Sequence, residues 1–265
     1  MNTSIENKIL DCLPAFKPID LVSIEKASLM RRKDSKYVYP ITSIPDILKA
    51  VSHSYYILEI DKIRAHDYNT LYYDTMNMDM YHMHHRGMSN RQKIRFRTYG
   101  SSDVVFFEVK EKNNKGVTSK KRMKSNNGHG VILSKEEEFL ASLTAYQESD
   151  IKPVLENTFK RITLVEKNQK ERITIDYDLC FMTPDHSKVL QFPGISIAEI
   201  KREGNLSASG LNAVLRKNKI YPMRFSKYCM GTAMLNEALP SNNFKQKILK
   251  VNKINASYLS ALNTK

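Results

Sequence analysis

Apolar and charged residues alternate in several short segments of the chain. In residues 93–97, Lys93, Arg95 and Arg97 alternate with two apolar residues. Because successive side chains of a β-strand point to opposite faces, this segment predicts a strand with one basic face and one apolar face. Charged residues share one face in the same way in residues 32–36, 106–110, 172–176 and 197–201. The sequence therefore predicts a sheet with an ionic side and an apolar side.

Further strands and helices are expected along the chain. β-branched and aromatic residues mixed with charges predict strands at residues 36–40, 55–63, 70–74, 92–99, 103–112, 158–166, 171–180 and 196–202. Apolar residues at helical spacing predict helices at residues 5–13, 44–51, 135–147, 207–218, 225–237 and 242–250. Residues 113–130 and 203–206 are expected to be loops. Strands and helices in this mixture indicate an α+β fold.

The chain shows neither an internal repeat nor a linker long enough to divide it. We therefore expect one domain of residues 1–265. Its N-terminal helix is expected at about 4–13, its strands at about 28–202 and its C-terminal helices at about 207–250.

The ionic faces of the strands could point to either side of the sheet. A solvent-facing ionic side is the ordinary arrangement of an amphipathic sheet. Two features favour the opposite arrangement: arginine is used heavily, and the helices before, between and after the strands need apolar surface on which to pack. If these helices cover the apolar side, the ionic faces point inward. The prediction is a β-barrel, closed or nearly closed, with a basic polar lumen and surrounding helices.

The charge balance indicates what such a lumen would bind. Lys and Arg number 42 against 28 Asp and Glu, a formal net charge of +14, which points to nucleic acid, an acidic membrane or polyphosphate. Unpaired buried cations are costly, and a bound polyanion would relieve that cost. Arg and Lys suit phosphate oxygens. The carboxylates of Glu199 and Asp176 are then expected to hold a divalent metal that bridges phosphates.

Cysteine usage and the N-terminal sequence indicate a compartment. Cys12, Cys180 and Cys229 are scattered and odd in number, which argues for a reducing environment. The first residues lack the pattern of a signal peptide, and no stretch approaches the roughly 18 apolar residues of a membrane span. These features predict a cytoplasmic protein with no direct membrane span.

Several motifs, taken in order, resemble a known family. LMRRKDSKYVYP at 29–40, YYDT at 72–75, RQKIRFRTYG at 91–100, FFEVKEK at 106–112, RITIDYDL at 172–179, IAEIK at 197–201 and MRFSKY at 223–228 resemble the VTC domain, over about residues 25–230. This is the polyphosphate polymerase domain of the triphosphate tunnel (CYTH-like) superfamily. The resemblance implies an antiparallel barrel that forms a tunnel. It also implies transfer of the γ-phosphoryl group of ATP to a growing polyphosphate chain, with release of ADP and with Mn²⁺ or Mg²⁺ as cofactor.

The resemblance also implies roles for individual residues. The family's basic phosphate-binding positions fall on Lys36, Arg95, Arg97, Lys110, Arg161, Arg172, Lys201, Arg224 and Lys227, with a further one on Lys121 or Arg122. Lys36, Arg95, Arg97 and Lys227 are expected to act in catalysis, and the other positions, with Arg32 and Ser226, in substrate binding. Glu199 falls on the family's metal carboxylate.

One departure from the superfamily pattern bears on the reaction. Triphosphate hydrolases and adenylate cyclases of this fold carry Glu-x-Glu-x-Lys near the N-terminus, where this chain reads Arg-Lys-Asp-Ser-Lys at 32–36. Fewer acidic ligands and more positive charge favour the polymerase. The alternatives are a triphosphate or nucleotide phosphohydrolase of the same fold, a non-catalytic module that binds polyphosphate or inositol phosphates, and an RNA-binding protein. The expected partners are ATP, polyphosphate and, by analogy with the family, a membrane subunit, but no specific nucleic acid.

Overall fold

The structure is a computed structural model that describes residues 3–26, 33–100, 104–115, 117–126 and 130–264. Arg32 lies outside the described residues. The strands are β1 (Lys17–Ile19), β2 (Lys33–Pro40), β3 (Tyr55–Leu58), β4 (Ala65–Thr75), β5 (Arg91–Tyr99), β6 (Val104–Lys112), β7 (Thr118–Ser125), β8 (Ile151–Glu166), β9 (Glu171–Met182) and β10 (Val189–Arg202). The helices are α1 (Thr3–Leu10), α2 (Leu21–Lys26), α3 (Ile44–Val51), α4 (Asp79–His85), α5 (Ser134–Leu143), α6 (Gly210–Lys217), α7 (Lys227–Leu235) and α8 (Lys245–Asn263).

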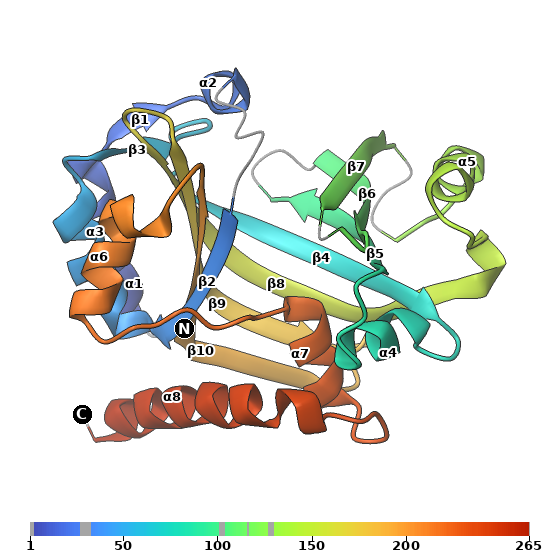
Figure 1. Ribbon diagram of the computed structural model, residues 1–265. Coiled ribbons are helices and arrows are strands. Elements are labelled where there is room, and N and C mark those ends of the chain that lie inside the picture. Colours follow the sequence, from blue (N-terminus) through green and yellow to red (C-terminus); the bar gives the residue numbers. More distant parts are fainter. Residues whose placement is uncertain (1–2, 27–32, 101–103, 116, 127–129, 265) are drawn as a thin grey trace.

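The described strands form one curved sheet. Its main path runs β2-β10-β9-β8-β4-β5-β6-β7, all antiparallel, and β3 joins β8 and the short parallel strand β1 (Figure 1). Register shifts interrupt the pairing of β4 with β8, of β8 with β9 and of β9 with β10. Such irregularities bend strands, which helps this sheet to curve around a concave face. The α+β class and the antiparallel sheet are as predicted.

The sheet does not close into the predicted barrel. Within the described residues, β2 and β7 end the main path and do not pair with each other. Both edge strands are rich in lysine, and like charges disfavour pairing of two edges. The concave face therefore lies between two walls, β2, β10 and β9 on one side and β5, β6 and β7 on the other (Figure 1).

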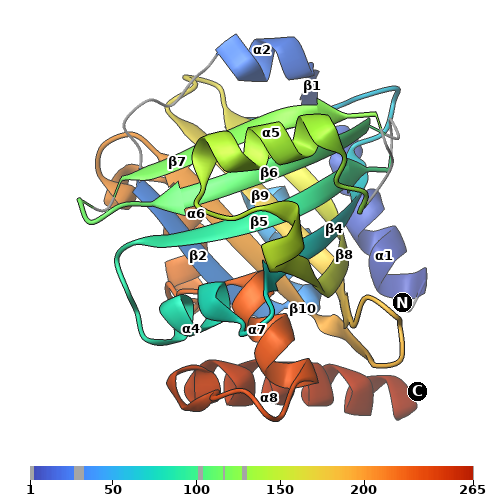
Figure 2. The same ribbon diagram turned by 90° about the vertical axis from the view of Figure 1, so that its right-hand side faces the viewer.

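Helices cover the convex side of the sheet, as expected. α1, α3 and α6 enclose a core with outward-facing residues of β2, β8, β9 and β10. α5 lies across β6 and β7, where Leu140 is fully buried (Figure 2). α8 runs along β10 and β2, and Asn255 Oδ1 accepts a hydrogen bond from the Gly194 backbone N–H at 2.9 Å. None of the described helices has the length and hydropathy needed to cross a lipid bilayer.

α7 packs on the concave side of the sheet. Its residues form a core with Leu155 of β8 and Phe181 of β9. Gly231 makes the close approach possible: a Cβ there would lie 2.6 Å from Phe181 and 2.8 Å from Leu155. α7 thus fills one end of the concave face.

Some local predictions were wrong. The segment 113–130, expected to be a loop, contains β7. Residues 79–85, for which neither a helix nor a strand was predicted, form α4. Asp74 stabilises the start of α4, because its carboxylate accepts hydrogen bonds from the backbone N–H groups of Met80 and Tyr81 at 2.9 and 2.8 Å. The predicted helix at 242–250 is the first part of the longer α8.

Candidate functional site

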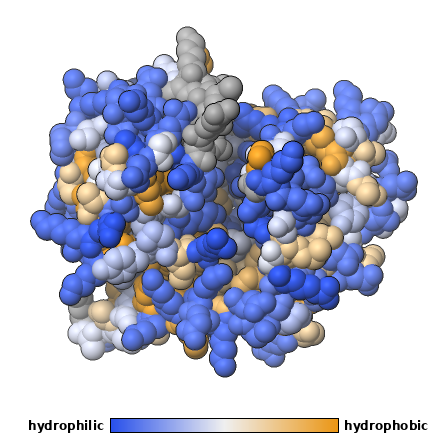
Figure 3. Space-filling view, viewed as in Figure 1, coloured by the Kyte–Doolittle hydropathy of each residue, from blue (hydrophilic) through white to orange (hydrophobic). Residues whose placement is uncertain are grey.

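Strand pairing brings charged residues of seven strands to the concave side, and the start of α7 adds Lys227. Lys36 pairs with Glu199, Lys201 with Arg172, and Arg95 with Glu108. We call the resulting set the ionic face. Its described cations include Lys36, Lys93, Arg95, Arg97, Lys110, Lys120, Arg122, Arg161, Arg172, Lys201 and Lys227, and its carboxylates are Asp34, Glu108, Asp176 and Glu199. In the space-filling view the surface is hollowed between the two walls (Figure 3).

Glu108 of β6 is the centre of one cluster on this face. Its Oε2 accepts hydrogen bonds from Arg95 Nε at 2.7 Å and Nη2 at 2.6 Å, and lies 3.9 Å from Arg97 Nη1. Its Oε1 forms an ion pair with Lys120 of β7. Burial acts to raise the pKa of Glu108, but the three cations outweigh it and hold that pKa far below its usual range. The carboxylate therefore stays ionised.

Asp176 of β9 is the centre of a second cluster. Arg161 Nε and Nη2 donate to its two oxygens at 2.6 and 2.8 Å, and Lys227 at the start of α7 contacts Oδ2. Burial favours protonation, but Arg161 and Lys227 lower the pKa of Asp176 far below its usual range. The Arg161 guanidinium stays protonated. Of the two cations that contact Asp176, Lys227 is therefore the one that can lose its proton. Burial lowers the pKa of Lys227 to about 7 in spite of its contact with Asp176.

Glu199 of β10 is more accessible than these two. Lys201 Nζ lies 2.7 Å from its Oε2, and Lys36 Nζ of β2 lies 3.8 Å from its Oε1. Burial opposes ionisation, but Lys201 and Lys36 lower the pKa of Glu199 well below its usual range. Glu108, Asp176 and Glu199 are thus each outnumbered by the cations that contact them.

Two further lysines lack even this compensation. Among the described residues, Lys93 and Lys110 form no ion pair, although Lys93 Nζ donates to Ser226 Oγ at 2.9 Å. Burial lowers the pKa of Lys93 to about 7, with Lys36 and Lys110 acting in the same direction. Burial also lowers the pKa of Lys110 to about 8, with Lys36 of the opposite wall adding to it. Burial therefore disfavours the charged form of these lysines, and an anion bound to the ionic face would favour it.

The N-terminal end of α7 joins both walls. Ser226 is the N-cap, and its Oγ accepts hydrogen bonds from the Cys229 N–H at 3.2 Å and from Lys93 of β5. Lys36 of β2 donates to the Phe225 carbonyl at 3.0 Å. The helix start and its partial positive charge therefore lie against the ionic face.

The residues only partly fit a resident metal ion. The described residues hold no group of three or more His, Cys, Asp or Glu side chains placed to bind a metal. Both oxygens of Asp176 are bound by Arg161 and Lys227, an arrangement that disfavours the metal role expected for Asp176. Glu199 fits as a single ligand, because Mg²⁺ and similar ions often bind one or two carboxylates together with substrate phosphates and water.

The remaining residues that were expected to bind substrate do not all reach the ionic face. Arg122 pairs with Glu108 on the ionic side of β7, and its guanidinium lies 4.6 Å from the centroid of the Phe106 ring. Lys121 pairs with Val109, so it points to the other side of β7. Arg224 is exposed just before α7. The structure therefore brings Arg122, and not Lys121, to the ionic face.

Four members of the ionic face received no role from the sequence: Asp34, Lys93, Glu108 and Lys120. Strand alternation had already placed the first three on the ionic side, where they share a strand face with Lys36, Arg95 and Lys110. Lys120 was placed in a loop, and only its pairing with Lys110 shows that it joins them.

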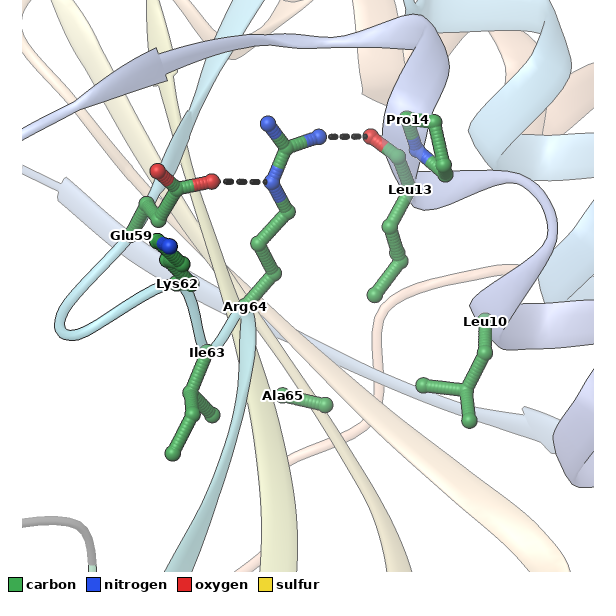
Figure 4. Close-up of a pocket in the computed structure, with 8 residues that line it drawn as sticks. All are labelled: Leu10, Leu13, Pro14, Glu59, Lys62, Ile63, Arg64 and Ala65. Atoms are coloured by element: carbon green, nitrogen blue, oxygen red, sulfur yellow. Dashed lines mark hydrogen bonds and ion pairs between the residues drawn. The ribbon is translucent and has the colours of Figure 1, made fainter.

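A groove elsewhere on the surface does not involve these residues. It has a volume of about 510 Å³ and lies between the α1 end and the β3–β4 turn (Figure 4). Arg64 is fixed beside it, donating to Glu59 Oε2 at 2.6 Å and to the Leu13 carbonyl at 2.7 Å. None of the residues expected to bind phosphate lines this groove.

Comparison with solved structures identifies the fold. HpAC1 from Hippeastrum, described as an adenylyl cyclase candidate with a dominant triphosphatase activity, is 12% identical with a TM-score of 0.50, over 80% of this chain and 99% of that one. PH1819 from Pyrococcus horikoshii OT3 is 15% identical with a TM-score of 0.41, over 74% and 96% of the two chains. A protein from Bacillus halodurans described as an adenylate cyclase candidate is 12% identical with a TM-score of 0.44, over 74% and 94%.

These comparisons agree with the resemblance seen in the sequence. The fold is that of the triphosphate tunnel (CYTH-like) proteins. No curated protein matches the sequence. The VTC domain matches residues 31–236, most of the chain and all of the strands that carry the ionic face. The protein therefore belongs to the VTC domain family.

Proposed function

We propose that the protein is an ATP-dependent polyphosphate polymerase. The VTC domain and the triphosphate tunnel fold support an enzyme that handles phosphate chains. The observation that carries the proposal is the excess of cations over carboxylates on one shared concave face. A polyphosphate chain has one charge per phosphate and presents oxygens all along its length, so it matches an extended set of Lys and Arg side chains.

The reaction would be an in-line phosphoryl transfer. A terminal oxygen of the polyphosphate chain forms a bond to the γ-phosphorus of ATP, and the bond from that phosphorus to the β–γ bridging oxygen breaks. ADP leaves, and the chain grows by one phosphate. Lys36, Arg95 and Arg97 would surround the transferred group, while Lys227 and the α7 N-terminus would hold neighbouring phosphates. Positioning and charge neutralisation supply most of the catalysis in such transfers, so no protein nucleophile is needed.

A divalent metal, Mn²⁺ or Mg²⁺, would neutralise charge on the phosphate oxygens when bound. Glu199 would be its ligand from the protein, because it is ionised and more exposed than Asp176 and Glu108. Asp176 would instead hold Arg161 and Lys227 in place.

The described carboxylates also favour transfer over hydrolysis. A hydrolase of this face would need a group to orient or deprotonate water. Glu108, Asp176 and Glu199 each contact at least two cations and have pKa values far below neutrality, so these three carboxylates are poorly suited to accept a proton. Their state favours the polymerase over a hydrolase that would use one of them as its base.

The test is the product formed from ATP and Mn²⁺. We expect polyphosphate chains, seen on a gel, and one ADP for each phosphate incorporated. Arg95→Ala should lose both products, and Arg216→Ala, at an exposed position of α6, should retain them. Free phosphate in place of chains would support the hydrolase, and tripolyphosphate binding without turnover would support a binding module.

A further inference from the structure

Glu108 is buried more deeply than the other carboxylates of the ionic face. Its side chain is 0% exposed, against 4% for Asp176 and 17% for Glu199. It lies in the middle of β6, where it pairs with Arg95 of β5 and Arg122 of β7 and forms an ion pair with Lys120 of β7. Within the described structure, every ionic contact of Glu108 is with a residue of the ionic face.

The two arginines near Glu108 are held from both sides. From the β6 side, Glu108 binds Arg95 through two guanidinium nitrogens and lies near Arg97. From the β4 side, the Tyr72 hydroxyl lies 3.5 Å from Arg95 Nη1, and the Thr70 hydroxyl lies 3.4 Å from Arg97 Nε. Long side chains lose considerable rotamer freedom when they are fixed in this way. The arginines are thus oriented before any ligand arrives.

A carboxylate at this place opposes the binding of an anion. Its negative charge repels phosphate, so it weakens the attraction that the surrounding cations provide. Turnover depends on a different property, because transition-state charge is stabilised only by donors in the right positions. A displacement of about 1 Å can cost about 100-fold in rate.

We propose that Glu108 is a positioning residue, which holds Arg95 and Arg97 where they stabilise the phosphoryl transfer and holds Lys120 beside them. The inference rests on the proposed function, since it assigns Glu108 a part in that reaction. It separates two quantities: Glu108 lowers the affinity for polyanion through its charge and raises turnover through its geometry.

The test compares three variants with the wild type. Glu108→Gln removes the charge at nearly constant shape, and Glu108→Asp keeps the charge but shortens the side chain. Glu111→Gln is the matched control, because Glu111 is an exposed residue of β6 on the opposite face. We would measure kcat and KM for ATP, and the Kd of inorganic tripolyphosphate by calorimetry at fixed pH and salt.

Glu108→Gln should lower kcat by about tenfold or more, while its Kd for tripolyphosphate stays within about threefold of the wild type or becomes tighter. Glu108→Asp should have an intermediate kcat and an unchanged Kd, and Glu111→Gln should match the wild type. A Glu108→Gln enzyme with unchanged kcat would overturn the inference. So would a loss of kcat matched by an equal loss of affinity and of melting temperature, since that indicates damage to the fold.

Two further measurements test the inference if Glu108→Gln does not fold or if the wild type does not elongate polyphosphate. If Glu108→Gln does not fold, the kcat and Kd of Glu108→Asp decide. If the wild type does not elongate polyphosphate, the proposed function fails on the wild type itself. The Nε–H NMR signals of Arg95 and Arg97 in the tripolyphosphate complex then decide: signals broadened or shifted in Glu108→Gln support positioning, and unchanged signals overturn it.

Discussion

The two ends of the concave face have opposite chemistry although the same strands build both. At one end, β8, β9 and β10 contribute Arg161, Asp176 and Glu199. At the other end the same three strands contribute Leu155, Phe181 and Phe192, which pack with α7. The apolar end is filled by the helix, and the ionic end faces the space between the walls (Figure 1).

The comparison shows what keeps the ionic end accessible. Burying apolar surface under α7 is favourable by about 25 cal/mol per Å², so the helix docks where the strands are apolar and stops where they become charged. Its N-terminus then lies at the boundary, where Lys36 and Lys93 contact Phe225 and Ser226. One end therefore supplies stability and positions the helix, and the other presents the cations that we propose bind phosphate.

The largest effect is expected at the ionic end, from Glu199→Ala. Turnover should fall by about 100-fold or more, because the residue that would hold the divalent metal at the reacting phosphates is lost. Tripolyphosphate affinity should be kept or rise, since Lys36 and Lys201 lose a competing partner. Product gels and calorimetry measure both, with Glu203→Ala, an exposed residue beyond β10, as control. Normal polymerisation by Glu199→Ala would remove Glu199 from the mechanism.

At the apolar end, Gly231→Ala should disturb the contact between α7 and the sheet. A Cβ would meet Phe181 and Leu155 at less than van der Waals distance. Overpacking of this kind costs about 1–3 kcal/mol of unfolding free energy. Chemical denaturation would measure the loss, and turnover should fall with it because the α7 N-terminus shifts. Full stability in the variant would show that α7 packs less closely than described.

The ionic end should also respond to pH in a way that the apolar end cannot. Lys93, Lys120 and Lys227 have pKa values of about 7, and Lys110 of about 8, all lowered by burial. These lysines are cations below those values. Tripolyphosphate affinity should therefore fall by about tenfold between pH 7 and pH 9, a change that a 1.4 kcal/mol loss of attraction would produce.

The lowered pKa values of these lysines can also be tested by measuring proton uptake when tripolyphosphate binds. Binding near pH 8 should take up protons, which calorimetry in buffers of different ionisation enthalpy detects. The folded pKa values lie below the unfolded value of 10.5, so the unfolded chain holds more protons between them. Without ligand, the contribution of these lysines to stability should rise as the pH rises from 7 towards 10. A pH-independent affinity would contradict the assigned burial of the lysines.

The smallest effects are expected from a matched pair of threonines. Thr174 at the ionic end and Thr232 in α7 are buried, and within the described structure neither hydroxyl has a hydrogen-bond partner. Thr232→Val should leave binding unchanged and raise stability by about 1 kcal/mol, because an unsatisfied buried hydroxyl is removed. Thr174→Val should weaken tripolyphosphate binding about threefold to tenfold, the loss of one hydrogen bond. Equal binding by both variants would show that the Thr174 hydroxyl does not face the ligand.

The sequence by itself determined the chemistry of the sheet. Alternation in residues 93–97 and 197–201 predicted strands with one ionic face, because side-chain direction along a strand depends only on local geometry. Helices on the apolar side followed from the need to bury that surface. The order of short motifs was enough to indicate the VTC domain, which the match to residues 31–236 confirmed.

Only the tertiary structure decided which charges meet and how far the sheet closes. Glu108 binds Arg95, Asp176 binds Arg161 and Lys227, and β7 brings in Lys120, which the sequence had placed in a loop. These pairings join residues from different strands, and their energies depend on distances and burial that strand periodicity does not contain. The open edge between β2 and β7, and the place where α7 docks, depend in the same way on contacts between segments remote in sequence.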